Sequence, residues 1–226
     1  VISSSSDVLI QADKATFDIT TTRFNTTGEL SIEPLSASFG SAFTYQNINL
    51  ESTATGLTLG KTGNTSAITI ANATTVSGPM NIYSNDLAVQ AAFEATNSRI
   101  TFSGAGANDT NGTLETLANA NIIADELLVR NFHRAYVGYK SPNFVGTVAV
   151  NKLASDGGDW LFVNNSKALT VENIAGVDGV SVSGFTRVYT ESEDLSINAP
   201  VTSSLSSGTA IQLFADRDAT AGQAGD

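Results

Sequence analysis

The sequence predicts an all-β protein built as a β-solenoid, in which short strands wind into about ten stacked coils. Apolar-x-apolar units, typical of half-buried strands, recur along the whole chain. Most of them are three residues long, which is short for the strands of a β-sandwich. Gly, Asn, Asp, Ser and Thr separate the units at short intervals, as turn residues do.

The expected strands share the same alternation of an apolar, a polar or small, and a second apolar residue. In chain order they are Val8–Ile10, Ala15–Ile19, Leu30–Ile32, Ile48–Leu50, Leu57–Leu59, Ile68–Ile70, Met80–Ile82, Leu87–Val89, Ile100–Phe102, Leu127–Val129, Val148–Val150, Leu161–Val163, Leu169–Val171, Val180–Val182, Leu195–Ile197 and Ile211–Leu213. Coils of about 20 to 25 residues would stack these units in parallel, with apolar ladders inside and Thr, Ser and Asn outside or in turns.

A β-sandwich is the competing architecture. It requires longer strands, and its immunoglobulin-like form pairs a core Trp with two Cys residues. Trp160 is the single Trp and the chain has no Cys. The solenoid is therefore favoured.

Composition excludes several classes of function. The net charge is −11, from 22 acidic and 11 basic residues, which argues against a nucleic-acid partner. No apolar run is long enough to span a membrane as a helix. Without Cys there is no disulfide, thiolate metal site or Cys nucleophile, and His133 is the single His. No phosphate-cradling loop or nucleotide fingerprint occurs, so neither cofactor nor metal is expected.

The expected organisation is one solenoid segment over residues 1–215, with a loop excursion at 104–117. That stretch is rich in Asn and Gly and breaks the strand rhythm. Residues 216–226 lack a strand pattern and are expected to be a loop or the truncated start of a following coil. Because Val1 is not preceded by Met or a signal sequence, we expect a piece or a processed product of a longer protein.

Two blocks of sequence resemble a known family. Gly56–Thr65 reads GLTLGKTGNT, and Ile68–Ile82 reads ITIANATTVSGPMNI. Tyr136–Tyr139, Asn143–Val150 and Asp194–Val201 repeat the impression in the second half. In the order of these blocks, over most of residues 28–215, the chain resembles the filamentous-haemagglutinin-type, β-strand-repeat adhesins, which are very large bacterial surface proteins.

The resemblance implies a right-handed parallel β-helix that is exported to the extracellular side of the bacterial cell surface. It implies the shaft of an adhesin or fibre, not an enzyme. The expected partners are adjacent solenoid segments, in the same or another chain, and surface glycans or proteins.

One basic and aromatic cluster stands out in this acidic chain, and it predicts a ligand-binding site. It could hold an anionic glycan by charge and ring stacking, or bind a protein. Its residues are Arg130, Phe132, His133, Arg134 and Tyr136.

Two alternative functions remain open. Asp156 and Asp159 could serve a β-helix polysaccharide hydrolase or lyase as an acid/base pair, although the motifs of such enzymes are absent. Uncapped solenoid ends could also let subunits stack into an extracellular filament.

Overall fold

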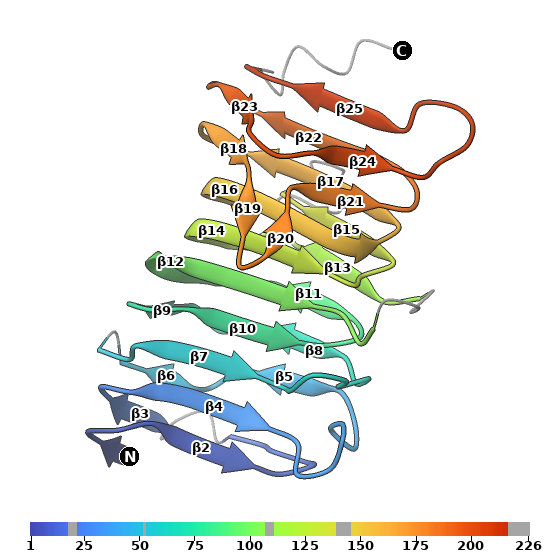
Figure 1. Ribbon diagram of the computed structural model, residues 1–226. Helices are drawn as coiled ribbons and strands as arrows, with labels where there is room; N and C mark the ends of the chain where they lie inside the picture. Colours follow the sequence, from blue (N-terminus) through green and yellow to red (C-terminus); the bar gives the residue numbers. More distant parts are fainter. Residues whose placement is uncertain (18–21, 52, 107–110, 139–145, 217–226) are drawn as a thin grey trace.

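The chain is a parallel β-helix. The computed structural model describes residues 1–17, 22–51, 53–106, 111–138 and 146–216, and no helix occurs among them. In Figure 1 the strands in front run left to right and those behind run right to left while the chain climbs, so the coil is right-handed. Both the all-β class and the solenoid are therefore confirmed.

The front sheet of Figure 1 is a stack of parallel strands. Along it lie β2 (Val8–Gln11), β4 (Glu29–Glu33), β7 (Gly56–Leu59), β10 (Met80–Tyr83), β12 (Ala92–Ser103), β14 (Asn121–Arg130), β16 (Thr147–Gly158), β18 (Leu169–Val171) and β23 (Leu195–Ile197), with β21 (Val180–Val182) and β24 (Val201–Ser203) continuing beside β16.

The back sheet contains eight strands that also pair in parallel. From the N-terminal end they are β5 (Phe43–Tyr45), β8 (Ile68–Ile70), β11 (Leu87–Val89), β13 (Thr113–Thr116), β15 (Arg134–Val137), β17 (Trp160–Asn165), β22 (Thr186–Thr190) and β25 (Ile211–Phe214).

A third face closes the coil. It consists of β1 (Ile2–Ser4), β3 (Arg23–Thr26), β6 (Asn49–Leu50) and β9 (Thr74–Val76), followed by the first halves of β12, β14 and β16. β12 pairs with β9 through Phe93–Ala95 and with β10 through Ile100–Ser103. Each of these long strands therefore bends around a corner and serves two faces.

The solenoid has about eight turns, fewer than the ten expected. Residues that pair between neighbouring rungs lie 19 positions apart for Ile68 with Leu87, and 27 apart for Leu87 with Leu114. Most coils are longer than the expected average because their corners contain extended connections, so the same chain completes fewer turns.

Inward side chains form continuous ladders through the core. Leu30, Leu57, Met80, Ile100 and Leu127 stack on the front sheet, and every one of them is fully buried. Burying apolar surface in this way supplies about 25 cal/mol per Å². The buried ladders continue through Leu153 on β16 to Val171 on β18.

Part of the segment 104–117 belongs to the sheet. Thr113–Thr116 forms β13, which pairs with β11 and β15, so the expected excursion is wrong for these four residues. Residues 107–110 lie outside the described part of the chain. At the C-terminal end, β25 finishes at Phe214 and the described chain at Asp216, so the expectation for 216–226 stays a prediction.

An insertion that the sequence pattern missed is an antiparallel hairpin, β19 (Asn173–Ile174) and β20 (Val177–Asp178), placed between β18 and β21. It lies over the outer surface of the front sheet (Figure 1). Ile174 and Val177 form a second apolar cluster with the outward-facing Leu128 and Ala154. The hairpin therefore gives this sheet a small external core.

Candidate functional site

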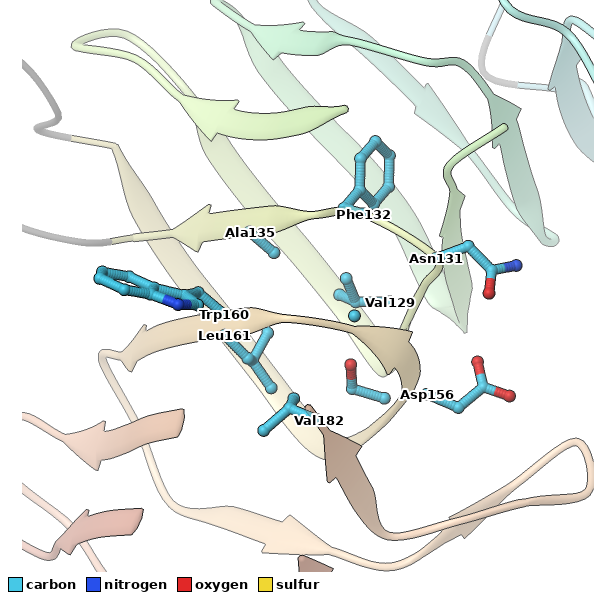
Figure 2. A pocket seen from close by; sticks show the side chains of 10 residues that line it. Val129, Asn131, Phe132, Ala135, Asp156, Trp160, Leu161 and Val182 are labelled. Atoms are coloured by element: carbon cyan, nitrogen blue, oxygen red, sulfur yellow. The ribbon is translucent and has the colours of Figure 1, made fainter. Parts of the chain in front are cut away.

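The structure separates the five predicted binding residues. Phe132 belongs to the core and is 1% exposed, so its predicted role in surface binding is wrong. Figure 2 shows Phe132, Ala135, Leu161 and Val182 around an interior space that has no room for a water molecule. This space is a packing gap and not a ligand site.

Arg130 lies at the end of β14, on the outer surface of the front sheet. Its Nε and Nη2 donate to Oδ1 and Oδ2 of Asp156 on the next rung, each at 2.8 Å. This two-pronged bond raises the pKa of Arg130. Arg130 therefore forms an ion pair that joins β14 to β16.

His133 occupies the corner between the front and back sheets. Its Nδ1 lies 3.5 Å from Oδ2 of Asp159, while Oδ1 of Asp159 accepts a bond from the Ser183 hydroxyl at 2.8 Å. Asp156 and Asp159, the two carboxylates considered for catalysis, are thus both engaged with neighbours. Neither arrangement resembles a free acid/base pair.

Arg134 and Tyr136 belong to a larger surface on the outside of the back sheet, which we call the aromatic–arginine platform. Three successive rungs, β15, β17 and the start of β22, each contribute two outward side chains at positions i and i+2. Its residues are Arg134, Tyr136, Trp160, Phe162, Phe185 and Arg187.

Contacts between rings, and between guanidinium groups and rings, hold the platform side chains in place. The Tyr136 and Phe162 rings are parallel within 17°, with centroids 5.1 Å apart. The guanidinium carbon of Arg134 lies 4.8 Å from the Trp160 ring centroid. Such ring–ring and cation–π contacts contribute about 0.5 to 1.5 kcal/mol each beyond simple burial.

At the opposite corner of the platform, a second arginine also lies over an aromatic ring. The guanidinium of Arg187 lies 5.5 Å from the Phe185 ring centroid, and its Nε donates to Oε1 of Gln212 at 2.7 Å. Phe162 sits at the centre and is 7% exposed, whereas Trp160 at the edge is 36% exposed. The platform is thus a flat apolar patch with an arginine at each of two corners.

The arginines of the platform differ from the others in the described ranges. Arg23, Arg99 and Arg130 each lie within 4.0 Å of a carboxylate. Arg134 and Arg187 have no such partner among the described residues. Although the chain has twice as many acidic as basic residues, two guanidinium groups on one surface thus have no carboxylate partner within the described part of the chain.

Glu115 flanks the platform on the rung below, directly opposite Tyr136. Partial burial raises the pKa of this carboxyl, and the nearby charge of Asp86 raises it further. The folded chain therefore holds this proton more tightly than the unfolded chain does.

We expect this group to make stability depend on pH. Since the folded pKa is the higher one, the free energy of unfolding should fall as pH rises above the ordinary value of 4.5. Glu115→Gln should remove that fall and leave the chain at least as stable at pH 7. Urea unfolding at a series of pH values measures this, with the exposed Asp178→Asn as the control. An unchanged pH profile in Glu115→Gln would contradict the assignment.

The front sheet carries a different surface. Glu126 links Arg99 (3.8 Å) and Lys152 (3.7 Å), and Lys152 reaches Glu172 at 3.1 Å. The bond to Glu172 raises the pKa of Lys152. These half-buried ion pairs form a ladder across the rungs, and each such pair near the surface contributes little to the free energy of unfolding.

Nearer the N-terminus, the front sheet has a shallow polar hollow of about 400 Å³. Outward side chains of β4, β7 and β10 line it, among them Glu29 and Tyr83. Its Lys61 donates to the Pro34 carbonyl at 2.9 Å, and Glu29 accepts a bond from the Thr58 hydroxyl. Its polar groups thus already bond to one another.

Four platform residues were not predicted from the sequence: Trp160, Phe162, Phe185 and Arg187. The available signal was the coil length, because Trp160 follows Arg134 by one coil and Phe185 follows Trp160 by the next. The triplets Arg-Ala-Tyr, Trp-Leu-Phe and Phe-Thr-Arg align in register at this spacing. Each has a bulky outward residue at both ends.

No family model, curated protein or solved structure matches the chain. Among the described residues, no cluster of three or more His, Asp or Glu side chains could hold a metal ion. The described residues also include no helix long and apolar enough to cross a membrane.

Proposed function

We propose that the chain is a non-catalytic structural segment of the shaft of a secreted bacterial surface adhesin or fibre, which presents binding surfaces and mediates attachment. The observation that carries this proposal is the uninterrupted stacking of about eight coils around one apolar core. Every rung pairs with the next through backbone hydrogen bonds along both main sheets, which makes a rod stiff along its axis.

The engagement of Asp156 and Asp159 supports a non-catalytic role. The resemblance of Gly56–Ile82 to adhesin repeats supports an extracellular place at the bacterial surface.

The exposed apolar residues of the last described coil favour packing against further solenoid coils. In the last described coil Ile197, Ile211 and Leu213 continue the inward ladders, yet they are 37 to 43% exposed. We therefore propose adjacent solenoid coils, of this or another chain, as the partners of this surface.

A shaft should hold its two ends at a fixed separation. The chain has no Cys, so cysteines introduced at the exposed Ser5 and Ser206 can be labelled specifically for energy-transfer measurements. Eight steps between rungs predict a separation along the axis of roughly 40 Å. We expect one narrow distance distribution when the labelled chain is displayed on a bacterial surface.

The labelled chain carrying Ile70→Asp, whose unfolding is argued in the Discussion, is the control of equal length. It should give a broad distribution centred at a different separation. Equally broad distributions for the two chains would overturn the proposed shaft function.

A further inference from the structure

Two guanidinium groups that have no carboxylate partner among the described residues mark the aromatic–arginine platform as a site for an acidic ligand. We propose that the platform binds an acidic polysaccharide that carries a carboxylate on every second sugar. This inference goes beyond the shaft function, because it assigns a ligand class to one surface of the rod.

The contacts with aromatic rings hold both guanidinium groups in positions from which they can bind carboxylates. The guanidinium of Arg134 lies over the Trp160 ring and that of Arg187 lies over the Phe185 ring, and N–H groups that do not contact the ring can donate to a ligand. A planar guanidinium held in this way can bind a carboxylate through two parallel hydrogen bonds, with less loss of side-chain entropy. The remaining Arg187 donors are available because Gln212 takes only Nε.

The aromatic rings suit a sugar chain between the two charges. The Tyr136 and Phe162 rings stack face to face, and the Phe185 ring packs against Phe162 at an angle of 51°, so the rings form a continuous apolar row between the two arginines. Trp160, at 36% exposed, adds apolar surface that sugar C–H groups can contact. The patch therefore combines apolar rings with the positive charge of two guanidinium groups.

The distance between the two arginines determines how far apart the carboxylates of a ligand must be. Arg134 lies on β15 and Arg187 on β22, two rungs apart, which corresponds to roughly 10 Å along the axis. That separation is close to the length of one disaccharide in an extended polysaccharide. Carboxylates on alternate sugars would meet the two arginines while the sugar between them lies over Trp160 and Phe162.

The fold favours a glycan over an acidic peptide. β17, at the centre of the platform, pairs with β15 on one side and β22 on the other, so no free strand edge is available for an added peptide strand.

Titration calorimetry with hyaluronan oligosaccharides, in which glucuronate alternates with N-acetylglucosamine, tests the proposal. We expect saturable binding that weakens as salt is added. The double variant Arg134→Gln/Arg187→Gln should bind about tenfold more weakly, because it loses both charge-assisted contacts. Neutral dextran should not bind.

The matched control is Arg23→Gln/Arg99→Gln, which removes the same charge from arginines that already have carboxylate partners. It should keep the affinity within about twofold. Thermal unfolding confirms that each variant is folded. Equal losses in the two double variants, equal binding of dextran, or equally tight binding of poly-glutamate would each overturn the proposal.

Absence of hyaluronan binding to the unmodified chain would also overturn it. A chain that binds no polysaccharide but keeps its fixed end-to-end separation loses this inference and keeps the shaft function.

Discussion

Ile70→Asp is expected to abolish the folded state at 25 °C. Ile70 is fully buried on β8 and stacks between Tyr45 and Val89 of the neighbouring rungs. The change removes about 2 to 5 kcal/mol of packing and adds the cost of a buried carboxylate. Together these losses approach the total stability of a typical domain, about 5 to 15 kcal/mol. Far-UV circular dichroism against temperature should show no cooperative transition.

The matched control is Thr69→Asp, one position earlier on the same strand. Thr69 points outward and is half-buried, so the same new charge should cost about 1 kcal/mol. Because each coil packs only on its neighbours, the damage from Ile70→Asp should spread through adjoining rungs. A melting temperature for Ile70→Asp close to that of Thr69→Asp would contradict the ladder structure.

Asn165→Leu is expected to produce the second large loss. This fully buried side chain donates from Nδ2 to the carbonyls of Val150 (2.9 Å) and Lys167 (2.8 Å). Its Oδ1 accepts the Val150 N–H at 2.9 Å. Leucine has a similar volume but leaves these backbone groups unpaired inside the corner, which should cost about 3 kcal/mol or more.

Asn151→Leu provides the comparison, because Asn151 is exposed and bonds to one side chain, that of Asp125. Its loss should stay below about 1 kcal/mol. Urea unfolding of both variants, analysed with a common m-value, measures the difference. If Asn165→Leu is no less stable than Asn151→Leu, the buried amide does not hold the corner.

Strands that could be predicted from the sequence differ from the others in the type of side chain that points into the core. Val148–Val150 and Leu161–Val163 have an apolar residue at both inward positions and were predicted at their observed places. β13 and β22 place Thr116 and Thr186 inside, where both are fully buried. A pattern that counts threonine as polar cannot detect such rungs.

Two inward threonines have hydroxyls that lie next to a backbone group or another hydroxyl, whereas the buried Thr186 Oγ1 has no hydrogen-bond partner among the described residues. Thr116 Oγ1 accepts the Gly138 N–H at 2.8 Å, and Thr74 Oγ1 lies 3.1 Å from the Tyr45 hydroxyl. Which threonines face inward depends on the register between coils, and one sequence does not define that register.

Only part of the candidate site could be predicted, because the sequence alone does not define which side chains lie on the same face. A local cluster of charge and rings drew attention to residues 130–136, of which Arg134 and Tyr136 belong to the platform. Phe132 and Arg130 lie close in sequence but turn into the core and onto the front sheet. Alternation along a strand and the bend at a corner separate side chains that sequence proximity groups together.

The short distance in sequence between paired strands affects how the rod could be completed in a cell. Partners on neighbouring rungs lie within 29 positions of each other, although the strands of the coil pair in parallel. A nascent coil therefore needs only one preceding coil as its template, and no contact waits for a distant part of the chain. A polypeptide of this kind can therefore fold turn by turn in step with its synthesis, and its first coils can form before its last residues exist.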